Sequence, residues 1–225
     1  MPTALVTGAS AGLGRALAAA LVSRKWTVVG DGRDAAALAS AAREIGFTAV
    51  PGDVADPAHR ASLAEACPEL DLLVNNASSL GVSPLPPLSR YPLAELENVY
   101  RVNVFAPLAL TQLLLPALTA ARGFVIDVSS DAAVEAYEGW GGYGSAKAAL
   151  DQLTAVLGAE NPDLAVYAVD PGDLRTAMHQ RAFPGEDISD RPLPEVSVPG
   201  VLRLVDEDLP SGRYQARALV PEATA

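Results

Sequence analysis

The chain has 225 residues, of which half are hydrophobic and 19% are charged, and its formal net charge is −11. This length suits one large α/β domain with a single core, and the high apolar content excludes wholesale disorder. The negative charge disfavours nucleic acid or an anionic membrane surface as the main partner. We therefore expect a single domain over residues 1–225 that acts on small molecules.

The cysteine content and the apolar runs indicate the compartment. Cys67 is the single cysteine of the sequence, so no intrachain disulfide is possible and a reducing compartment fits. We expect no targeting leader before the first strand. The longest apolar run, from about Val104 to Leu118, is interrupted by Pro107 and Pro116 and predicts a buried helix instead of a membrane span. A cytoplasmic protein is the expectation.

Short apolar stretches alternate with amphipathic ones along most of the chain. The predicted strands are Ala4 to Thr7, Trp26 to Gly30, Thr48 to Pro51, Leu70 to Asn75, Phe124 to Val128 and Leu164 to Val169. The predicted helices are Leu13 to Ser23, Ala35 to Glu44, Ala58 to Ala66, Leu93 to Ala121 and Tyr143 to Ala159. This alternation predicts right-handed crossovers and a doubly wound parallel sheet, the Rossmann fold, with helices on both faces.

The C-terminal fifth of the chain has weaker periodicity. Residues Met178 to Pro199 are rich in Pro, Asp and Glu. We expect a mobile substrate loop over about residues 177–200 with a short helix in it. A last strand around Arg213 to Leu219 is expected to close the sheet.

A glycine-rich turn, TGASAGLG, occupies residues Thr7 to Gly14 between the first strand and the first helix. Glycines there permit a sharp turn and a close approach of a pyrophosphate to the backbone. The helix N-terminus then offers free N–H groups and partial positive charge to the phosphates. An ordinary strand-to-helix turn is the alternative, so the motif must be judged together with others.

Tyr143 and Lys147 are four residues apart at the start of a predicted helix, which places both side chains on one face. A phenol with a pKa of about 10 is a poor acid–base catalyst at neutral pH, and a neighbouring ammonium lowers that pKa. The pair therefore has the composition of a general acid/base. The spacing is common in helices, and a structural role is the alternative.

Ser129 and Ser130 follow the predicted strand Phe124 to Val128. The carboxyl end of a parallel strand is where ligands bind in open α/β folds. A hydroxyl at this edge can hold a substrate oxygen beside the phenol of Tyr143. The alternative is that both serines make a local turn.

These motifs resemble the short-chain dehydrogenase/reductase family. The Gly-x3-Gly-x-Gly spacing after Thr7, the separation of 13 residues between Ser130 and Tyr143, and the Tyr-x3-Lys pair all match. Further matches, in family order, are Asp53-Val54, Asn75-Asn76-Ala77 and the segment from Pro171-Gly172 to Thr176. Ser78 stands where the family has glycine, and Asp173 stands where a small or apolar residue is common.

The resemblance implies an NAD(P)-dependent carbonyl reductase or alcohol dehydrogenase that moves a hydride between nicotinamide and a small carbonyl or alcohol substrate. The implied catalytic residues are Asn103, Ser130, Tyr143 and Lys147. The implied cofactor-binding residues are Gly8, Ser10, Gly12, Leu13, Gly14, Arg33, Asp53, Val54, Asn76, Ala77, Tyr143, Lys147, Pro171, Gly172 and Thr176. Asn103 would kink the central helix and hold a water linked to the lysine, with a solvated asparagine as the alternative.

The end of the second strand bears on the choice of cofactor. An acidic residue at the strand tip would bond the ribose 2′-hydroxyl and favour NAD. Alignment on the valines places Gly32 at the tip and Arg33 after it, which suits a 2′-phosphate. A shift of one residue would place Asp31 there instead. We expect NADP(H) to be favoured over NAD(H).

The substrate is poorly specified by the sequence. The candidate pocket walls are Ser79 to Val82, Val134 to Trp140 and Met178 to Phe183. Glu135, Glu138 and Asp173 favour a neutral or cationic substrate over an acidic one. His59 and His179 are too far apart for a metal site, and we expect both at the surface and no metal.

Two further expectations concern assembly and class. The apolar central helix, with the Tyr143 helix beside it, predicts a homodimer or homotetramer. The main alternative to an enzyme is a non-catalytic NADP-sensing regulatory protein of the same fold. Such a protein is expected to lack a catalytic residue, and this sequence lacks none. Dehydratase or epimerase chemistry is an alternative among enzymes.

Overall fold

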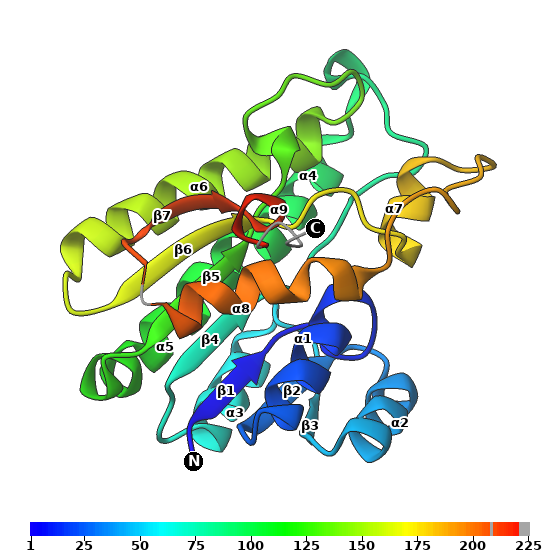
Figure 1. The fold of residues 1–225 in the computed structure, drawn as a ribbon. Helices are drawn as coiled ribbons and strands as arrows, with labels where there is room; N and C mark the ends of the chain where they lie inside the picture. Colours follow the sequence, from blue (N-terminus) through cyan, green and yellow to red (C-terminus); the bar gives the residue numbers. More distant parts are fainter. Residues whose placement is uncertain (208, 221–225) are drawn as a thin grey trace, which may run out of the picture.

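The computed structural model describes residues 1–207 and 209–220 (Figure 1). In this part of the chain, seven parallel strands form one sheet in the order β3-β2-β1-β4-β5-β6-β7. The strands are β1 (Thr3–Val6), β2 (Thr27–Gly32), β3 (Thr48–Pro51), β4 (Leu72–Asn75), β5 (Phe124–Val128), β6 (Ala165–Asp170) and β7 (Gly212–Gln215). The strand order reverses between β1 and β4, where open α/β sheets form a ligand crevice. The predicted doubly wound parallel sheet is confirmed.

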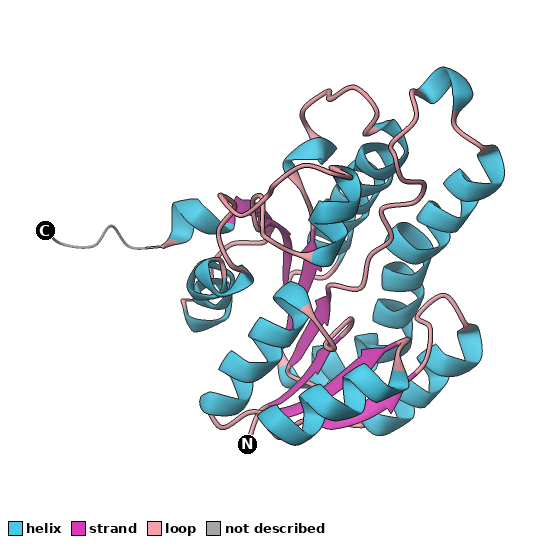
Figure 2. Ribbon diagram, turned by 90° about the vertical axis from the view of Figure 1, so that its right-hand side faces the viewer, coloured by secondary structure: helices cyan, strands magenta, loops and turns pink. Residues whose placement is uncertain are grey.

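Helices cover both faces of the sheet (Figures 1 and 2). The main helices are α1 (Gly12–Ser23), α2 (Ala35–Ile45), α3 (Pro57–Ala66), α4 (Leu93–Tyr100), α5 (Ala106–Ala121), α6 (Gly141–Glu160), α7 (Ala177–Ala182), α8 (Val198–Asp206) and α9 (Ala216–Leu219). Residues of α1, α2 and α8 share one buried cluster with the sheet, whereas residues of α3 and α5 share another. The sheet is therefore the middle of three layers.

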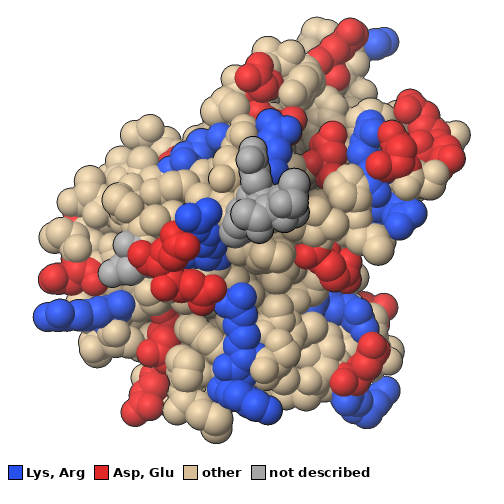
Figure 3. Space-filling view, viewed as in Figure 1, with Lys and Arg blue, Asp and Glu red and all other residues tan. Residues whose placement is uncertain are grey.

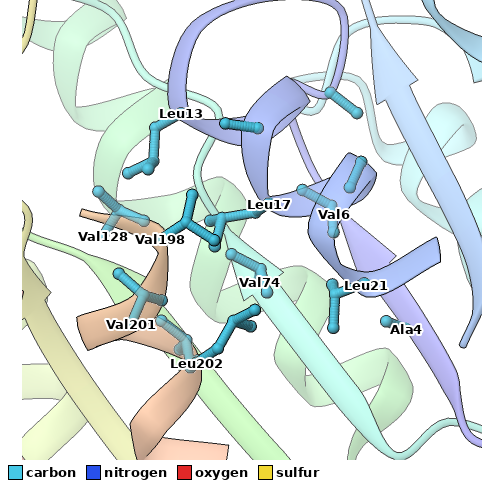
Figure 4. Packing of buried hydrophobic residues seen from close by; sticks show 14 of the residues in the cluster. Ala4, Val6, Leu13, Leu17, Leu21, Val74, Val128, Val198, Val201 and Leu202 are labelled. Atoms are coloured by element: carbon cyan, nitrogen blue, oxygen red, sulfur yellow. The ribbon is translucent and has the colours of Figure 1, made fainter. Parts of the chain in front are cut away.

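Successive residues of the central strands supply opposite faces of the core. In β1, Val6 belongs to the α1/α8 cluster and Leu5 to the α3/α5 cluster; Val74 and Leu73 of β4 divide in the same way. Figure 4 shows the first of these layers, with α1 and α8 packed over β1 and β4. Burial on both faces explains why these strands are continuous apolar runs without polar alternation.

The predicted C-terminal elements need correction in two places. Helix α8 begins at Val198, inside the segment expected to be loop, and Pro199 lies in its first turn. Proline is tolerated there because its missing N–H would have no partner in the helix. The last strand ends at Gln215, and α9 follows over residues that were expected to continue it. Ala216 is fully buried where the chain leaves the sheet.

The predicted long helix is present, but it has a wide turn in the middle. The π-helical turn η2 (Arg101–Phe105) joins α4 to α5 and contains Asn103. Leu93–Ala121 is long and apolar enough to cross a membrane by length and composition alone. However, Leu110, Leu114 and Leu118 are buried in the α3/α5 cluster. This helix therefore forms part of the core beside the sheet.

Candidate active site

A cavity of about 570 Å³ opens at the carboxyl ends of β1, β4, β5 and β6. Its walls come from the glycine-rich turn, the segment after β4, the segment after β5, helix α6 and the segment from β6 into α7. Among the residues that line it are Gly8, Gly12, Leu13, Asn76, Ala77, Ser130, Tyr143, Lys147, Pro171, Gly172 and Thr176. The predicted catalytic hydroxyl, phenol and ammonium therefore lie in one hollow with much of the predicted cofactor set.

The glycine-rich turn has the backbone that a pyrophosphate requires. Gly8 and Gly12 have φ of 69° and 56°, in the left-handed region that other residues avoid. A Cβ on Gly14 would collide with the carbonyl oxygen of Gly8 and the side chain of Asn76. Helix α1 begins without a side-chain cap, so its first N–H groups are available to an anion. The turn therefore fits a dinucleotide.

Thr7 connects this turn to the segment after β4. Its hydroxyl accepts hydrogen bonds from the N–H groups of Asn76 and Ala77, both at 2.9 Å, and the Asn76 amide donates to the Thr7 carbonyl at 2.8 Å. The two loops on either side of the strand-order reversal are thus fixed to each other. Asn75 points the other way and donates to Asp127 at 2.8 Å.

The sequence left open whether Gly32 or Asp31 lies at the tip of β2, and the end of this strand in the structure answers that question. The strand continues to Gly32, and Asp31 is buried one residue before the tip. Asp31 accepts a hydrogen bond from the N–H of Gly8 at 2.6 Å and lies 3.1 Å from Nε2 of His59. Its carboxylate is therefore engaged with protein groups, and Gly32 occupies the tip. Arg33, next along the chain, is exposed.

The remaining cofactor residues lie around this edge. Ser10 packs against Gly32. A Cβ added to Gly32 would lie only 3.1 Å from the Ser10 hydroxyl oxygen. Asp53 accepts a hydrogen bond from the N–H of Ala55 at 2.9 Å, which shapes the turn after β3, and Val54 is buried. Asp53 and Val54 lie outside the wall of the main cavity.

Tyr143 and Lys147 lie one turn apart on α6, and both are almost fully buried. Nζ of Lys147 donates to the carbonyl oxygen of Val128 at 2.6 Å and lies 5.6 Å from the centre of the Tyr143 ring. This described bond uses one of the three N–H groups of the ammonium. The others are free for ribose hydroxyls, so the residue fits the cofactor role implied for it.

Burial sets the protonation of this pair. Desolvation lowers the pKa of Lys147 to about 8, although Asp127 and Asp151 oppose the change. Desolvation also raises the pKa of Tyr143; the hydroxyls of Ser78 and Ser130 act in the opposite sense, and Asp131 and Asp170 raise it further. The sequence predicted a pKa for Tyr143 lowered by Lys147, and the buried environment has the opposite effect. Tyr143 is therefore a neutral phenol at neutral pH.

Asn103 is completely buried in the π-helical turn η2. Its side-chain oxygen accepts hydrogen bonds from the N–H of Ser79 at 2.8 Å and from the hydroxyl of Ser78 at 3.2 Å, and its amide donates to the Ser79 carbonyl at 2.9 Å. The alternative of a solvated asparagine is wrong. The side chain holds the segment after β4 against the central helix.

The predicted substrate loop contains α7 and is bonded to the opposite wall. The Thr176 hydroxyl caps α7 by accepting from the N–H of His179 at 3.1 Å. Arg181 donates to the carbonyl oxygen of Gly81 at 3.0 Å, and the Ser83 hydroxyl donates to the Arg181 carbonyl at 2.6 Å. These bonds hold α7 over the cavity and enclose the space beside Tyr143.

Comparisons with known proteins agree with this geometry. The family model described as short chain dehydrogenase matches residues 2–187. Serine 3-dehydrogenase from Rhizobium radiobacter is 35% identical over 77% of this chain and 72% of its own length, and mouse sepiapterin reductase is 34% identical over 79% and 76%. A short chain dehydrogenase from Shigella flexneri 2a, solved with NADP, superposes with a TM-score of 0.87 at 30% identity and covers 96% of this chain and 97% of its own. The chain belongs to the short chain dehydrogenase family.

Within this family, two histidines were misplaced by sequence reasoning. His59 was expected at the surface, but it is buried against Asp31 and packs over Gly52. His179 was also expected there, but its side chain is only 10% exposed and lines the cavity. Both lie in helices that follow strands, and their burial depends on which helical face meets the sheet edge. No signal in the local sequence gave that orientation.

Two carboxylates of the cavity were also missed. Asp131 follows Ser130 directly and accepts a hydrogen bond from its hydroxyl at 3.0 Å. Asp170, at the end of β6, is buried, and burial raises the pKa of its carboxyl group. Its position beside the Pro171-Gly172 match was the available signal. Both carboxylates line the same cavity as Ser130, Tyr143 and Lys147.

Proposed function

We propose that this protein is an NADP(H)-dependent oxidoreductase that reduces a small carbonyl compound or oxidises the corresponding alcohol. The observation that carries the proposal is the meeting of Tyr143, Lys147 and Ser130 in the cavity that also contains the glycine-rich turn. One domain would hold both the cofactor and the substrate. Serine 3-dehydrogenase and sepiapterin reductase, both oxidoreductases by name, support this class of reaction.

The residues of the chain would divide the chemistry in a simple way. Bound NADPH supplies the hydride. Tyr143, neutral because it is buried, gives its proton to the carbonyl oxygen in reduction and takes a proton back in oxidation. Ser130 orients the substrate oxygen through its hydroxyl. Lys147 keeps an ammonium beside the phenol and donates to the cofactor ribose, and Asn103 fixes the loop that forms the adjoining wall.

The tip of β2 supports NADP(H) over NAD(H). An acidic residue that bonds the ribose hydroxyls would need a free carboxylate at the tip, whereas Asp31 is buried on Gly8 and His59. Gly32 at the tip has no carboxylate, and Arg33 is exposed beside it with no ion-pair partner among the described residues. A guanidinium binds a 2′-phosphate with paired hydrogen bonds. The Shigella flexneri structure holds the same cofactor.

The decisive experiment is replacement of Tyr143 by phenylalanine. The full chain is assayed on a panel of aldehydes and ketones with NADPH and with NADH, and cofactor absorbance is followed. We expect Tyr143→Phe to lower kcat by about 10²–10⁴-fold because the proton donor is lost, while the Kd for NADPH changes by less than about threefold. Near-normal turnover in this variant would exclude Tyr143 as the acid.

A non-catalytic NADP sensor is the second candidate, and the presence of Ser130, Tyr143 and Lys147 in one cavity disfavours it. The same panel distinguishes the two, because a sensor binds NADPH without consuming it with any carbonyl. Dehydratase or epimerase activity would appear as substrate conversion without net change in cofactor absorbance.

The proposal also includes a homodimer or homotetramer and a cytoplasmic location. Phe105 and Leu113, on the π-helical turn and α5, are 59% and 50% exposed, which fits a helix pair buried by a second copy. Size-exclusion chromatography with light scattering tests for the dimer or tetramer. Cys67 is a buried free thiol, which fits the reducing cytoplasm.

A further inference from the structure

The charges around the cavity are strongly unequal. Three carboxylates line its wall, from Asp131, Asp170 and Asp173. In the part of the chain that the structure describes, Lys147 is the single Lys or Arg on that wall, and its ammonium is bonded to the Val128 carbonyl. This one buried ammonium is the group proposed to bind the cofactor ribose, so an anionic substrate group meets mainly carboxylates here. A cationic group meets an excess of negative charge.

Asp131 differs from the other two carboxylates. Asp170 lies 4.0 Å from a guanidinium nitrogen of Arg213, and Asp173 lies 3.8 Å from one of Arg191. Asp131 has no ion-pair partner among the described residues. Its oxygens accept hydrogen bonds only from neutral donors, namely the Ser130 hydroxyl, the N–H of Ala132 at 2.8 Å and the Tyr137 hydroxyl at 3.1 Å. A half-buried carboxylate without a cation is complementary to a charged ligand group.

A second feature of the same wall, independent of Asp131, is a buried imidazole nitrogen without a hydrogen-bond partner among the described residues. The side chain of His179 is nine-tenths buried, and its Nε2 has no hydrogen-bond partner among the described residues. Its Nδ1 lies on the side of Asp173, 4.0 Å from the carboxylate. A proton on Nδ1 suits that carboxylate and leaves Nε2 as an acceptor. The wall thus offers two acceptors, Asp131 and His179, to a ligand rich in N–H donors.

We propose that the cavity takes a substrate with an ammonium group on the carbon next to the reacting carbonyl or carbinol carbon, and that Asp131 binds this ammonium. The placement follows from the 3.0 Å between the Asp131 carboxylate and the Ser130 hydroxyl. A substrate oxygen at Ser130 brings an adjacent ammonium within reach of Asp131. This inference rests on the proposed function, because it needs Ser130 to hold the reacting oxygen. The reaction is an α-amino ketone to amino alcohol interconversion, in which the carbonyl carbon gains hydride and the oxygen gains the Tyr143 proton.

The excess of carboxylates on the described wall also limits the substrate. A carboxylate attached to the reacting carbon would lie among Asp131, Asp170 and Asp173, which have the same charge. We therefore expect amino ketones and amino alcohols to be preferred over the corresponding α-keto and α-hydroxy acids. The aromatic part of a test compound fits the apolar side of the cavity, which Leu80, Trp140 and Phe183 form.

The test compares three phenyl ketones that differ in the group on the carbonyl carbon: 2-aminoacetophenone with the amine on the methyl carbon (2-amino-1-phenylethanone), propiophenone and phenylglyoxylate. The ammonium of the first is replaced by a methyl group of similar size in the second, and the whole aminomethyl group is replaced by a carboxylate in the third. We expect kcat/KM with NADPH to favour 2-aminoacetophenone by about tenfold or more. Asp131→Asn should remove this preference over propiophenone, since the amide keeps the shape and loses the charge. Glu135, which the sequence placed in the pocket wall, is exposed and is not among the residues that line the cavity, so Glu135→Gln should retain the preference.

An equilibrium measurement separates this inference from the proposed function. Titration of NADPH-loaded protein with 2-amino-1-phenylethanol, a pair that cannot react, should give a Kd about tenfold weaker in Asp131→Asn than in the wild type, with 1-phenyl-1-propanol unaffected. If the wild type prefers propiophenone or phenylglyoxylate, or if Asp131→Asn leaves both the kinetic ratio and the Kd unchanged, the inference is wrong and the oxidoreductase stands. If no carbonyl consumes either cofactor, the proposed function fails, and the titration alone decides whether Asp131 binds an ammonium.

Discussion

The two sides of the cavity are built in different ways. On the proposed cofactor side, the wall is formed mainly by backbone groups and glycines. Gly8, Gly12 and Gly14 determine the shape of the turn, and Thr7 accepts a hydrogen bond from the Asn76 amide. On the substrate side, charged and polar side chains such as Asp131, Asp170 and His179 form the wall. A site made from backbone groups is retained when side chains change, whereas a site made from side chains can differ from one protein to another. The difference explains why family resemblance identifies the cofactor more readily than the substrate.

The surface beside the substrate side has mixed charge. On the face shown in Figure 3, acidic and basic side chains are interspersed, including where the loop after α7 leaves the body. Glu186, Asp187 and Asp190 belong to that loop, and all three are exposed. Arg191 of the same loop pairs with Asp190 and lies 3.8 Å from Asp173, so the rim has mixed charge and the excess of carboxylates is confined to the cavity wall.

The largest expected effect comes from a change on the cofactor side. Gly14→Ala adds a methyl group that must displace the Gly8 carbonyl and the Asn76 side chain. We expect the free energy of unfolding to fall by about 1–3 kcal/mol and the Kd for NADPH to rise by at least about tenfold, because the turn that presents the N–H groups is distorted. Denaturant unfolding and cofactor titration measure the two quantities.

Gly212→Ala is the matched control for this variant. A Cβ on Gly212 meets its nearest neighbour at 3.7 Å, an ordinary contact, so both quantities should stay close to those of the wild type. Equal losses of cofactor affinity in the two variants would mean that glycine replacement acts through general stability, and that the cofactor side is not fixed by close backbone approach.

An intermediate effect is expected from Lys147, which lies between the two sides. Its pKa is lowered to about 8 by burial, so the ammonium is present below that pH and is lost as the pH rises through it. If the ammonium donates to the cofactor ribose, the Kd for NADP⁺ should increase by roughly three- to tenfold between about pH 7 and pH 9.5. Fluorescence titration across that range measures it.

Lys147→Met is the informative variant for this titration. Methionine keeps an apolar body of similar length and has no charge to lose, so its Kd should be weaker than that of the wild type at pH 7 and nearly independent of pH. A wild-type Kd that is constant over the range, or the same pH dependence in both proteins, would show that Lys147 does not contribute to cofactor binding.

The contrast between a site made from backbone groups and one made from side chains also explains which features could be predicted from the sequence. The strand–helix alternation, the glycine turn and the Tyr143–Lys147 spacing are local patterns, and local patterns determine backbone direction and shared helix faces. The position of Asp31 was left open because it depends on where β2 ends: Gly32 is still paired with Pro51 of β3. The burial of Asp31 then follows from its contacts with Gly8 and His59, which come from distant parts of the chain.

Other features were missed because they depend on packing between segments. Helix α8 begins at the end of a segment rich in proline and acidic residues, and Val201, Leu202 and Leu204 bury one of its faces against the sheet. Asp131 looks like an ordinary turn residue in the sequence. Its proposed role can be recognised only in the folded chain, where Asp131 after β5, Asp170 of β6 and Lys147 of α6 line one cavity.

The smallest expected effect concerns Ser78, the residue that replaces the family glycine on the substrate side. Its hydroxyl bonds the Asn103 side chain at 3.2 Å and acts on the Tyr143 phenol, lowering its pKa against the effect of burial. Ser78→Gly should therefore raise the pKa of Tyr143 further. Alcohol oxidation needs the deprotonated phenol, so its kcat at a fixed pH of about 8 should fall two- to fivefold, which corresponds to loss of one modest hydrogen bond. Carbonyl reduction uses the protonated phenol and should change less.

Ser79→Ala is the control, because the Ser79 hydroxyl accepts a hydrogen bond from the N–H of Gly81 and its backbone keeps both bonds to Asn103. Comparison of kcat for oxidation and reduction in the two variants separates an effect on the phenol from an effect on loop position. A loss in oxidation alone, and only in Ser78→Gly, supports direct action of the hydroxyl on Tyr143. Equal losses in both directions and in both variants would mean that Ser78 only holds the loop, and that this departure from the family is structural.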